Sequence, residues 1–312
     1  MQKKLDVVVI GELNIDLVLW RVPMPENEKE QLAEDMRFAM GSSSAITAHN
    51  LSAIGAKVGF IGKAGNDTFG KYMIDALAAG GVDTSQIIVD DSLKTGATIV
   101  LANPPKKALL TYLGAMTQLT IDDLPWDYIA TAKHLHVGCF FLQTGLRKDV
   151  HKIFARAKAL GLSTSLDTNW DPDEQWGDDL HAALKETDIF LPNDDELLQI
   201  TKKQTIAEAV EAFPASVKVL AVKLGKDGAT VRALGNSFAH PGFSVESVET
   251  TGAGDSFNAG FLYRYLNGDD WASCLKFGNA CGAVAVTEMG GTGAFADREA
   301  LSRKLKSLLG EV

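Results

Sequence analysis

At 312 residues, the chain is long enough for one large α/β domain or two ordinary ones. Its 46% hydrophobic and 22% charged residues are typical of a globular protein and exclude a disordered one. The formal net charge of −10 argues against a nucleic-acid surface, which needs clustered Lys and Arg, and it disfavours a polyanionic substrate.

Cysteine usage and hydropathy give a first expectation of where the protein works. The three cysteines show no metal-binding spacing and cannot all pair with one another, which is typical of a reducing compartment. No stretch approaches the roughly 20 apolar residues of a membrane span, and the apolar run near the N-terminus is too short for the core of a signal peptide. We therefore expect a cytoplasmic protein with neither a membrane nor a nucleic acid among its partners.

The first predicted strand covers residues 6–11, a continuous β-branched run that ends at a glycine and is typical of a buried strand. In the extended stretch that follows, the period of two places Glu12, Asn14 and Asp16 on one face. Three polar groups at the end of a sheet can bind sugar hydroxyls, since one carboxylate accepts two hydrogen bonds at once. A solvated strand face is the alternative interpretation.

The next predicted elements alternate between strands and helices. A helix is predicted from Gly41 to Ile54, ended by Gly55, and another follows residues 65–70. Strand patterns occur at 31–38, 58–62, 86–89, 95–101 and 108–113. The two prolines within residues 103–106 predict a turn between the last two strands.

From residue 130 onward, predicted strands and helices alternate regularly, which implies a parallel sheet with helices on both faces. Strands are predicted at 134–137, 163–167, 188–191, 218–224 and 230–234. Helices are predicted at 146–160, 178–186, 194–202, 205–213, 254–267, 271–287 and 297–309. Since no internal repeat or linker interrupts the chain, we expect one domain over residues 1–312.

The most informative stretch joins a predicted strand at 243–248 to the helix that begins near residue 254. Gly252 and Gly254 allow tight backbone angles and let a ligand approach the amides. The first amides of a helix lack internal partners and lie at the positive end of its dipole, so they form an anion site. Asp255 adds a carboxylate, which we expect to be ionised at neutral pH. A phosphate beside this carboxylate indicates phosphoryl transfer with Asp255 as base, whereas a plain helix cap is the alternative.

The segment from Thr250 to Phe257, Thr-Thr-Gly-Ala-Gly-Asp-Ser-Phe, resembles the signature of the ribokinase-like carbohydrate kinases of the phosphofructokinase B type. Matching motifs near 11–16, 41–70, 193–196 and 223–228 extend the resemblance over nearly the whole chain. The resemblance implies a three-layer α/β sandwich, whose mostly parallel central sheet has helices on both faces, and a small β-sheet lid from segments at about 12–40 and 95–118. A plain hairpin on the edge of the main sheet is the alternative to the lid.

The activity that the resemblance implies is ATP-dependent phosphorylation of a sugar hydroxyl. Asp255 matches the family's base, and Gly252, Ala253 and Gly254 match its anion hole. The positions that match substrate contacts are Asn14, Asp16, Gly41, Ser42, Ile46, Gly65 and Asp167. Because Ser42 replaces a second glycine and Ile46 an asparagine, the family's usual sugar preference cannot be assumed. No arginine follows the Asp167-Thr-Asn motif, which favours an uncharged monosaccharide over an acidic or phosphorylated one.

The resemblance also implies ATP and Mg²⁺ as cofactors. The positions that match the nucleotide site are Asn193, Glu196, Lys223, Gly225, Gly228 and Asn279. Asn193 and Glu196 share one face of a helix start and match a pair that organises Mg²⁺ mostly through water, although a capping box explains the pair equally well. Relatives bind a monovalent cation near the positions of Glu249 and Thr251. Since this chain has glutamate where aspartate is usual, dependence on K⁺ is open.

Two other functions fit the same motifs. A nucleoside kinase on this fold needs an apolar slot, to which Ile46, Trp20 and Phe140 could contribute. A regulator that binds a sugar or nucleotide without turnover would leave the intact Asp255 unexplained. The sequence does not determine the sugar, the hydroxyl that is phosphorylated, the pathway or the oligomeric state, although the resemblance allows a homodimer through the lid.

Overall fold

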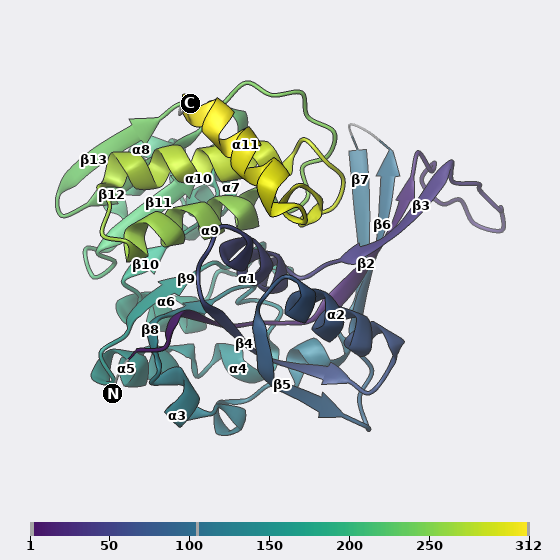
Figure 1. Cartoon of the computed structure of the whole chain (residues 1–312), viewed down its shortest axis with the longest axis horizontal. Coiled ribbons are helices and arrows are strands. Elements are labelled where there is room, and N and C mark those ends of the chain that lie inside the picture. Colours follow the sequence, from purple (N-terminus) through teal and green to yellow (C-terminus); the bar gives the residue numbers. More distant parts are fainter. Residues whose placement is uncertain (1–2, 104–105, 311–312) are drawn as a thin grey trace.

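Residues 3–103 and 106–310, which the computed structural model describes, form a nine-stranded sheet surrounded by helices and a separate four-stranded sheet (Figure 1). The larger sheet has the strand order β13-β12-β11-β10-β9-β8-β1-β4-β5. Its strands are β1 (Leu5–Ile10), β4 (Val58–Gly65), β5 (Asp83–Asp90), β8 (Ala132–Val137), β9 (Ser163–Leu166), β10 (Ile189–Phe190), β11 (Val219–Lys223), β12 (Ala229–Ala233) and β13 (Asn236–His240). Neighbouring strands from β5 to β11 are parallel, whereas β12 and β13 join antiparallel at one edge.

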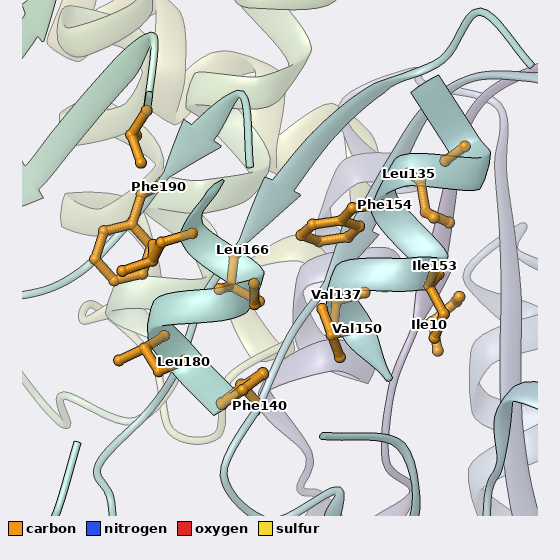
Figure 2. Close-up of a cluster of buried hydrophobic side chains, with 14 of the residues drawn as sticks. Ile10, Leu135, Val137, Phe140, Val150, Ile153, Phe154, Leu166, Leu180 and Phe190 are labelled. Carbon is orange, nitrogen blue, oxygen red and sulfur yellow. The ribbon is translucent and has the colours of Figure 1, made fainter. Parts of the chain in front are cut away.

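Both faces of the larger sheet are covered around β1 and β11, which explains why these two strands are largely apolar on both sides. On one face, Ile10, Leu135 and Leu166 of the strands pack against helical side chains such as Phe154 and Leu180 (Figure 2). The helices of this layer are α3 (Trp126–Ile129), α4 (Thr144–Arg147), α5 (Val150–Ala159), α6 (Asp178–Lys185), α7 (Asp194–Thr201) and α8 (Ile206–Ala212).

The opposite face is covered by a second layer of helices. These are α1 (Ser43–Ala53), α2 (Thr68–Ala79), α9 (Ala253–Leu266) and α10 (Trp271–Ala285), with α11 (Arg298–Leu309) packed against α10. Short 3₁₀ turns lie at η1 (Gly114–Thr117), η2 (Ile121–Asp123), η3 (Gly225–Asp227) and η4 (Gly293–Phe295). The arrangement confirms the predicted three-layer α/β sandwich with a mostly parallel central sheet.

The smaller sheet projects from the body of the molecule as a lid (Figure 1). It contains β2 (Asn14–Trp20), β3 (Asp35–Met40), β6 (Gly96–Asn103) and β7 (Lys106–Tyr112), in the order β3-β2-β6-β7. Its β6–β7 hairpin therefore does not extend the edge of the main sheet, and the lid interpretation is confirmed. The predicted turn at 103–106 includes residues 104 and 105, which lie outside the described residues.

The prediction of a strand at 243–248 is wrong. The described chain has irregular structure there, and the edge strand is instead β13, which the sequence did not predict. The alternation has a different origin, because Phe243 packs against the cluster between α10 and α11, and the amide of Val248 donates to the carbonyl of Val286 at 2.7 Å. The segment is held by the end of α10 and not by a neighbouring strand.

The predicted helix at 146–160 is divided into α4 and α5. The carbonyl of Asp149 accepts from the amides of Lys152 and Ile153, so α5 begins anew at a residue that has a low preference for helix interiors. In the part of the chain that the structure describes, no helix is long and apolar enough to cross a membrane.

Candidate active site

A cavity of about 530 Å³, the lid-side cavity, lies between the lid and the carboxyl ends of the main-sheet strands. Asp16 at the start of β2 and Asp255 in the first turn of α9 both line it. The lid strands contribute Thr98 and Lys107, among other residues. The structure thus brings together two carboxylates from distant parts of the sequence on the wall of one open cavity.

A second cavity of about 550 Å³ lies beside the first, between the loop after β11 and helix α10. Gly228 and Asn279 line it, and the Asn279 side-chain amide donates to the carbonyl of His240 at 3.0 Å. Four residues line both cavities: Lys223, Gly225, Thr250 and Gly254. We call this set the junction, because a ligand that extends through it reaches both cavities.

The junction contains the N-terminus of α9, which has the geometry of an anion site. Gly252 precedes the helix with φ of 75°, and a Cβ added there would lie 2.4 Å from the Cα of Gly291. Only glycine fits this left-handed, crowded position. Among the described residues, the amides of Gly254 and Asp255 have no hydrogen-bond acceptor, whereas that of Ser256 donates to Gly252 at 2.8 Å. Two amides at the positive end of the helix dipole are therefore free to bind an anion.

Asp255 is half-buried at this junction. Burial raises the pKa of its carboxyl well above the usual range, the charges of Asp167, Glu12 and Glu196 add to the increase, and Lys223 opposes it. Burial thus opposes the ionised form that the sequence predicts for Asp255, whereas the charge of Lys223 favours it. A carboxylate with a raised pKa is a stronger base once it has lost its proton.

Lys223 forms a buried ion pair at the junction. Its Nζ lies 2.7 Å from Oδ2 of Asp167, which also accepts from the side-chain amide of Asn258. Burial acts to raise the pKa of Asp167, but Lys223 holds it below its usual value, so the pair is ionised. Asp167 is only 2% exposed and does not line the lid-side cavity, so the predicted direct contact with substrate is not supported.

The start of β2 supplies the polar groups predicted for substrate binding. The side-chain amide of Asn14 donates to Asp16 Oδ1 and to the hydroxyl of Thr98, each at 3.2 Å. Gly41 leaves room for these side chains, because an added Cβ would lie 2.3 Å from Asp16 Oδ1 and 2.6 Å from Asn14 Nδ2 and would displace them. Ser42 lines the cavity, but its hydroxyl caps α1 by accepting from Ala45. Burial and the charge of Glu249 raise the pKa of Asp16 to about 7.

Ile46 and Gly65, like Gly41 and Asp167, do not line the lid-side cavity. Ile46 is 2% exposed and packs against Gly291, because this face of α1 is directed toward the loop after α10. Gly65 is buried in β4, where an added Cβ would lie 2.4 Å from the carbonyl oxygen of Leu93. Trp20, in the lid, and Phe140, in the main core, also do not line the cavity, so the apolar slot suggested for a nucleoside is not formed by these residues.

Asn193 and Glu196 line the lid-side cavity at the start of α7. They form a capping box, in which the amide of Glu196 donates to Asn193 Oδ1 at 2.8 Å and the amide of Asn193 donates to Glu196 Oε2 at 2.9 Å. Burial and the charge of Asp167 raise the pKa of Glu196 to about 7, while Lys223 opposes the increase. Together with Asp194, these oxygens suit Mg²⁺, which keeps most of its water and needs few protein ligands.

The proposed monovalent-cation residues are already linked within the protein. The hydroxyl of Thr251 donates to the carboxylate of Glu249, and the amide of Gly290 donates to its other oxygen at 2.8 Å. Glu249 thus joins the loop before α9 to the loop after α10. In the described part of the chain, no cluster of three or more His, Cys, Asp or Glu side chains could hold a metal ion by itself.

Two residues at this site, Asn258 and Lys107, have no role predicted from the sequence. Asn258 lies one helical turn after Asp255, and its position on the same face of α9 could have indicated its role. Glu12, which shares the predicted polar face with Asn14 and Asp16, is 2% exposed on the cavity wall. The contact of Lys107 with the cavity could not be predicted, because the alternation of residues in β7 does not tell which face of the lid covers the cavity.

Comparison with known proteins agrees with this geometry. Residues 4–297 match the model of the pfkB family of carbohydrate kinases. An ATP-dependent ribose-1-phosphate kinase of Halopiger xanaduensis is 31% identical over 91% of this chain and 93% of the relative. Fructokinase-2 of Oryza sativa subsp. japonica is 30% identical over 91% of this chain and 89% of the relative. A solved structure of a candidate ribokinase II of E. coli in complex with ATP and Mg²⁺ has 26% sequence identity to this chain. The two structures match with a TM-score of 0.86 over 97% of this chain and 99% of that one.

The fold and the site therefore define a ribokinase-like phosphotransferase. The chain belongs to the pfkB family of carbohydrate kinases and is an ATP-dependent carbohydrate kinase.

Proposed function

We propose that this kinase transfers the γ-phosphate of ATP to a hydroxyl of a small, uncharged monosaccharide, with Asp255 as the base. One observation carries the proposal: Asp255 lines a cavity that extends to Asp16 and meets a second cavity at the N-terminus of α9. In the proposed complex, the sugar occupies the lid-side cavity and ATP the second cavity. The hydroxyl to be phosphorylated then lies between Asp255 and the γ-phosphate.

The charge of the lid-side cavity supports an uncharged sugar. Its wall carries the carboxyl groups of Glu12, Asp16, Asp194, Glu196 and Asp255, against the two cations Lys107 and Lys223. Carboxyl groups accept hydrogen bonds from neutral hydroxyls, whereas an anionic sugar needs cationic partners, which are in the minority on this wall. The hydrogen-bonding groups of Asn14 and Asp16 suit the hydroxyls of such a sugar.

In the proposed mechanism, Asp255 accepts the proton of the attacking hydroxyl, and the predicted anion hole of Gly252, Ala253 and Gly254 stabilises the charge of the transferring group. The free amides of Gly254 and Asp255 contribute most of this stabilisation, because the amide of Ala253 already donates to the carbonyl of Thr250 at 3.3 Å. Positioning and charge stabilisation contribute more than base strength, because the transition state of phosphoryl transfer is loose. Asn193 and Glu196 would hold Mg²⁺ mostly through water, and the bound ion would compensate the charge of the phosphates. Glu249 and Thr251 are the proposed residues for K⁺, if the enzyme uses it.

The test is a comparison of Asp255→Asn with the wild type on a panel of neutral sugars, phosphorylated sugars and nucleosides, assayed by ADP formation. We expect Asp255→Asn to lose nearly all turnover, roughly 10²-fold or more, while its affinity for ATP stays within a few-fold. Asp270→Asn is the matched control, because Asp270 caps α10 outside both cavities and asparagine caps equally well. Substantial activity in Asp255→Asn would show that the base is assigned wrongly.

The same panel separates the alternative functions. Since one relative is named a ribose-1-phosphate kinase, phosphorylated pentoses are included, and a clear preference for them would contradict a neutral substrate. Preference for a nucleoside would identify a nucleoside kinase. ATP binding without turnover on any compound would favour a non-catalytic regulator. Running the panel with and without K⁺ tests dependence on a monovalent cation.

We further propose that the enzyme is a homodimer joined through the lid. The lid face away from the cavity carries the exposed apolar side chains of Phe38, Ile99, Leu110 and Tyr112, and Ile99 pairs directly with Leu110 across β6 and β7. Such a surface is typical of an interface between copies of a chain. The three cysteines are buried and free, and we propose the cytoplasm as the place of action because thiols remain reduced there.

A further inference from the structure

Lys223 has surroundings that nucleotide binding alone does not explain. Its side chain is only 13% exposed, yet it lines both the lid-side cavity and the second cavity. A Cβ added at Gly254 would lie 3.6 Å from the Nζ of Lys223, so the ammonium group lies close to the first turn of α9. This places a buried positive charge beside the free amides of the anion site.

The ammonium group is held by two side chains from different elements. It donates to Asp167 Oδ2 at 2.7 Å and approaches Asn258 Oδ1 at 3.4 Å. Asn258 in turn donates to Asp167, whose other oxygen accepts from the amide of Asn169 at 3.0 Å. Since an ammonium group has three donors, one remains for a ligand at the junction.

The carboxyl groups around Lys223 come from three elements. Asp167 follows β9, Glu196 lies in α7 and Asp255 in α9. Burial acts to lower the pKa of Lys223, but these three groups hold it above its usual value, so the cation persists in the closed site. A buried ion pair that only stabilised the fold would need no access to either cavity.

We propose that Lys223 is a catalytic residue that contacts the phosphoryl group during its transfer, and that Asp167 and Asn258 are positioning residues that aim it. The inference rests on the proposed function. The sugar oxygen forms a bond to phosphorus while the bond from phosphorus to the leaving oxygen breaks; ADP keeps that electron pair and Asp255 takes the hydroxyl proton. Lys223 exchanges no proton, and its charge stabilises the phosphoryl oxygens as they pass from one cavity to the other.

Asn258 links the two groups that act on the substrate, because its side chain binds Asp167 and its helix carries Asp255. Asn258 belongs to the same helix as Asp255, so one hydrogen-bonded unit sets the positions of both the base and the cation. Asp167, which the sequence analysis assigned to the substrate, then acts through Lys223 without touching the sugar.

The test compares Lys223→Met and Lys223→Arg with Lys63→Met, a matched control because Lys63 is a largely buried lysine in an ion pair with Asp123 and lines neither cavity. We expect kcat to fall about 100-fold in Lys223→Met, with KM for ATP changing much less, as for loss of a group that acts in the transition state. Lys223→Arg restores part of kcat, and Lys63→Met keeps a kcat close to that of wild type. Because loss of the cation raises the pKa of Asp255, the acidic limb of the kcat profile moves to higher pH in Lys223→Met.

The double variant Lys223→Met with Asp167→Asn removes both charges, so no unpaired buried charge remains if the single variant fails to fold. We expect it to fold and to lose kcat to the same extent as Lys223→Met. If either variant keeps kcat within about threefold of wild type while Asp255→Asn is inactive, the role of Lys223 is refuted and the proposed function stands. If the wild type turns over nothing on the panel, the proposed function fails first.

Discussion

Gly252 offers the sharpest structural test of the anion site, because its backbone conformation suits glycine and becomes unfavourable once a single methyl group is added. Its φ of 75° is left-handed, and this costs an alanine about 1–2 kcal/mol. The added Cβ would lie 2.4 Å from Gly291 Cα, whereas an ordinary contact begins at 3.4 Å. The two backbone segments must therefore separate by about 1 Å, a displacement that can lower an enzyme's rate by on the order of 10²-fold.

We therefore expect Gly252→Ala to reduce kcat by about 10²-fold and to destabilise the fold by roughly 2–4 kcal/mol, the sum of the conformational and overlap costs. In a protein of 312 residues, 2 kcal/mol corresponds to a decrease of about 3 °C in Tm. The assays are ADP formation with the best substrate of the panel and thermal unfolding.

Gly254→Ala is the matched control for stability. This residue lies within α9, and an added Cβ would meet only the Lys223 side chain, at ordinary contact distances of 3.6 Å and more. We expect its Tm to equal or exceed that of wild type, since alanine is favoured over glycine in helices by up to about 1 kcal/mol. If Gly252→Ala retained both the Tm and the kcat of wild type, the argument that this glycine fixes the amides would be refuted.

Two further changes test other parts of the site. Asp16 has a folded-state pKa of about 7 against 3.8 for an ordinary Asp, so the folded protein holds the proton more tightly than the unfolded chain and stability decreases as pH rises from about 4 to about 7. Asp16→Asn removes this loss. At about half the full 1.4 kcal/mol per pKa unit, a reduction made because the site is open to the cavity, the variant gains roughly 2 kcal/mol of stability over wild type near pH 8. Urea unfolding at both ends of the pH range measures how stability changes with pH, and an equal change in both proteins would contradict the raised pKa. Asn193→Ala removes the cap of α7 and costs about 1 kcal/mol of stability. It should also raise the Mg²⁺ concentration for half-maximal activity, and a change in Tm alone would leave Asn193 as a helix cap only.

The sequence predicted most of the fold because its strongest signals are local. The β-branched runs of β1 and β4 and the alternation of strands and helices after residue 130 each follow from a few neighbouring residues. Where the local signal had two explanations, prediction failed. Residues 243–248 alternate like a strand, but they pack along α10, and only the position of that helix distinguishes the two possibilities.

For the site, the sequence by itself determined the anion-binding turn and its carboxylate, since glycines, helix start and Asp255 lie within a few residues of one another. It also determined the polar face of β2, because a strand's period is fixed. Only the tertiary structure decided that Asp167 pairs with Lys223, that Ile46 packs against Gly291, and that Lys107 reaches the cavity. The reason is physical: a side chain's partner depends on which elements pack together, and contacts such as that between Asp167 and Asn258 join residues far apart in the chain.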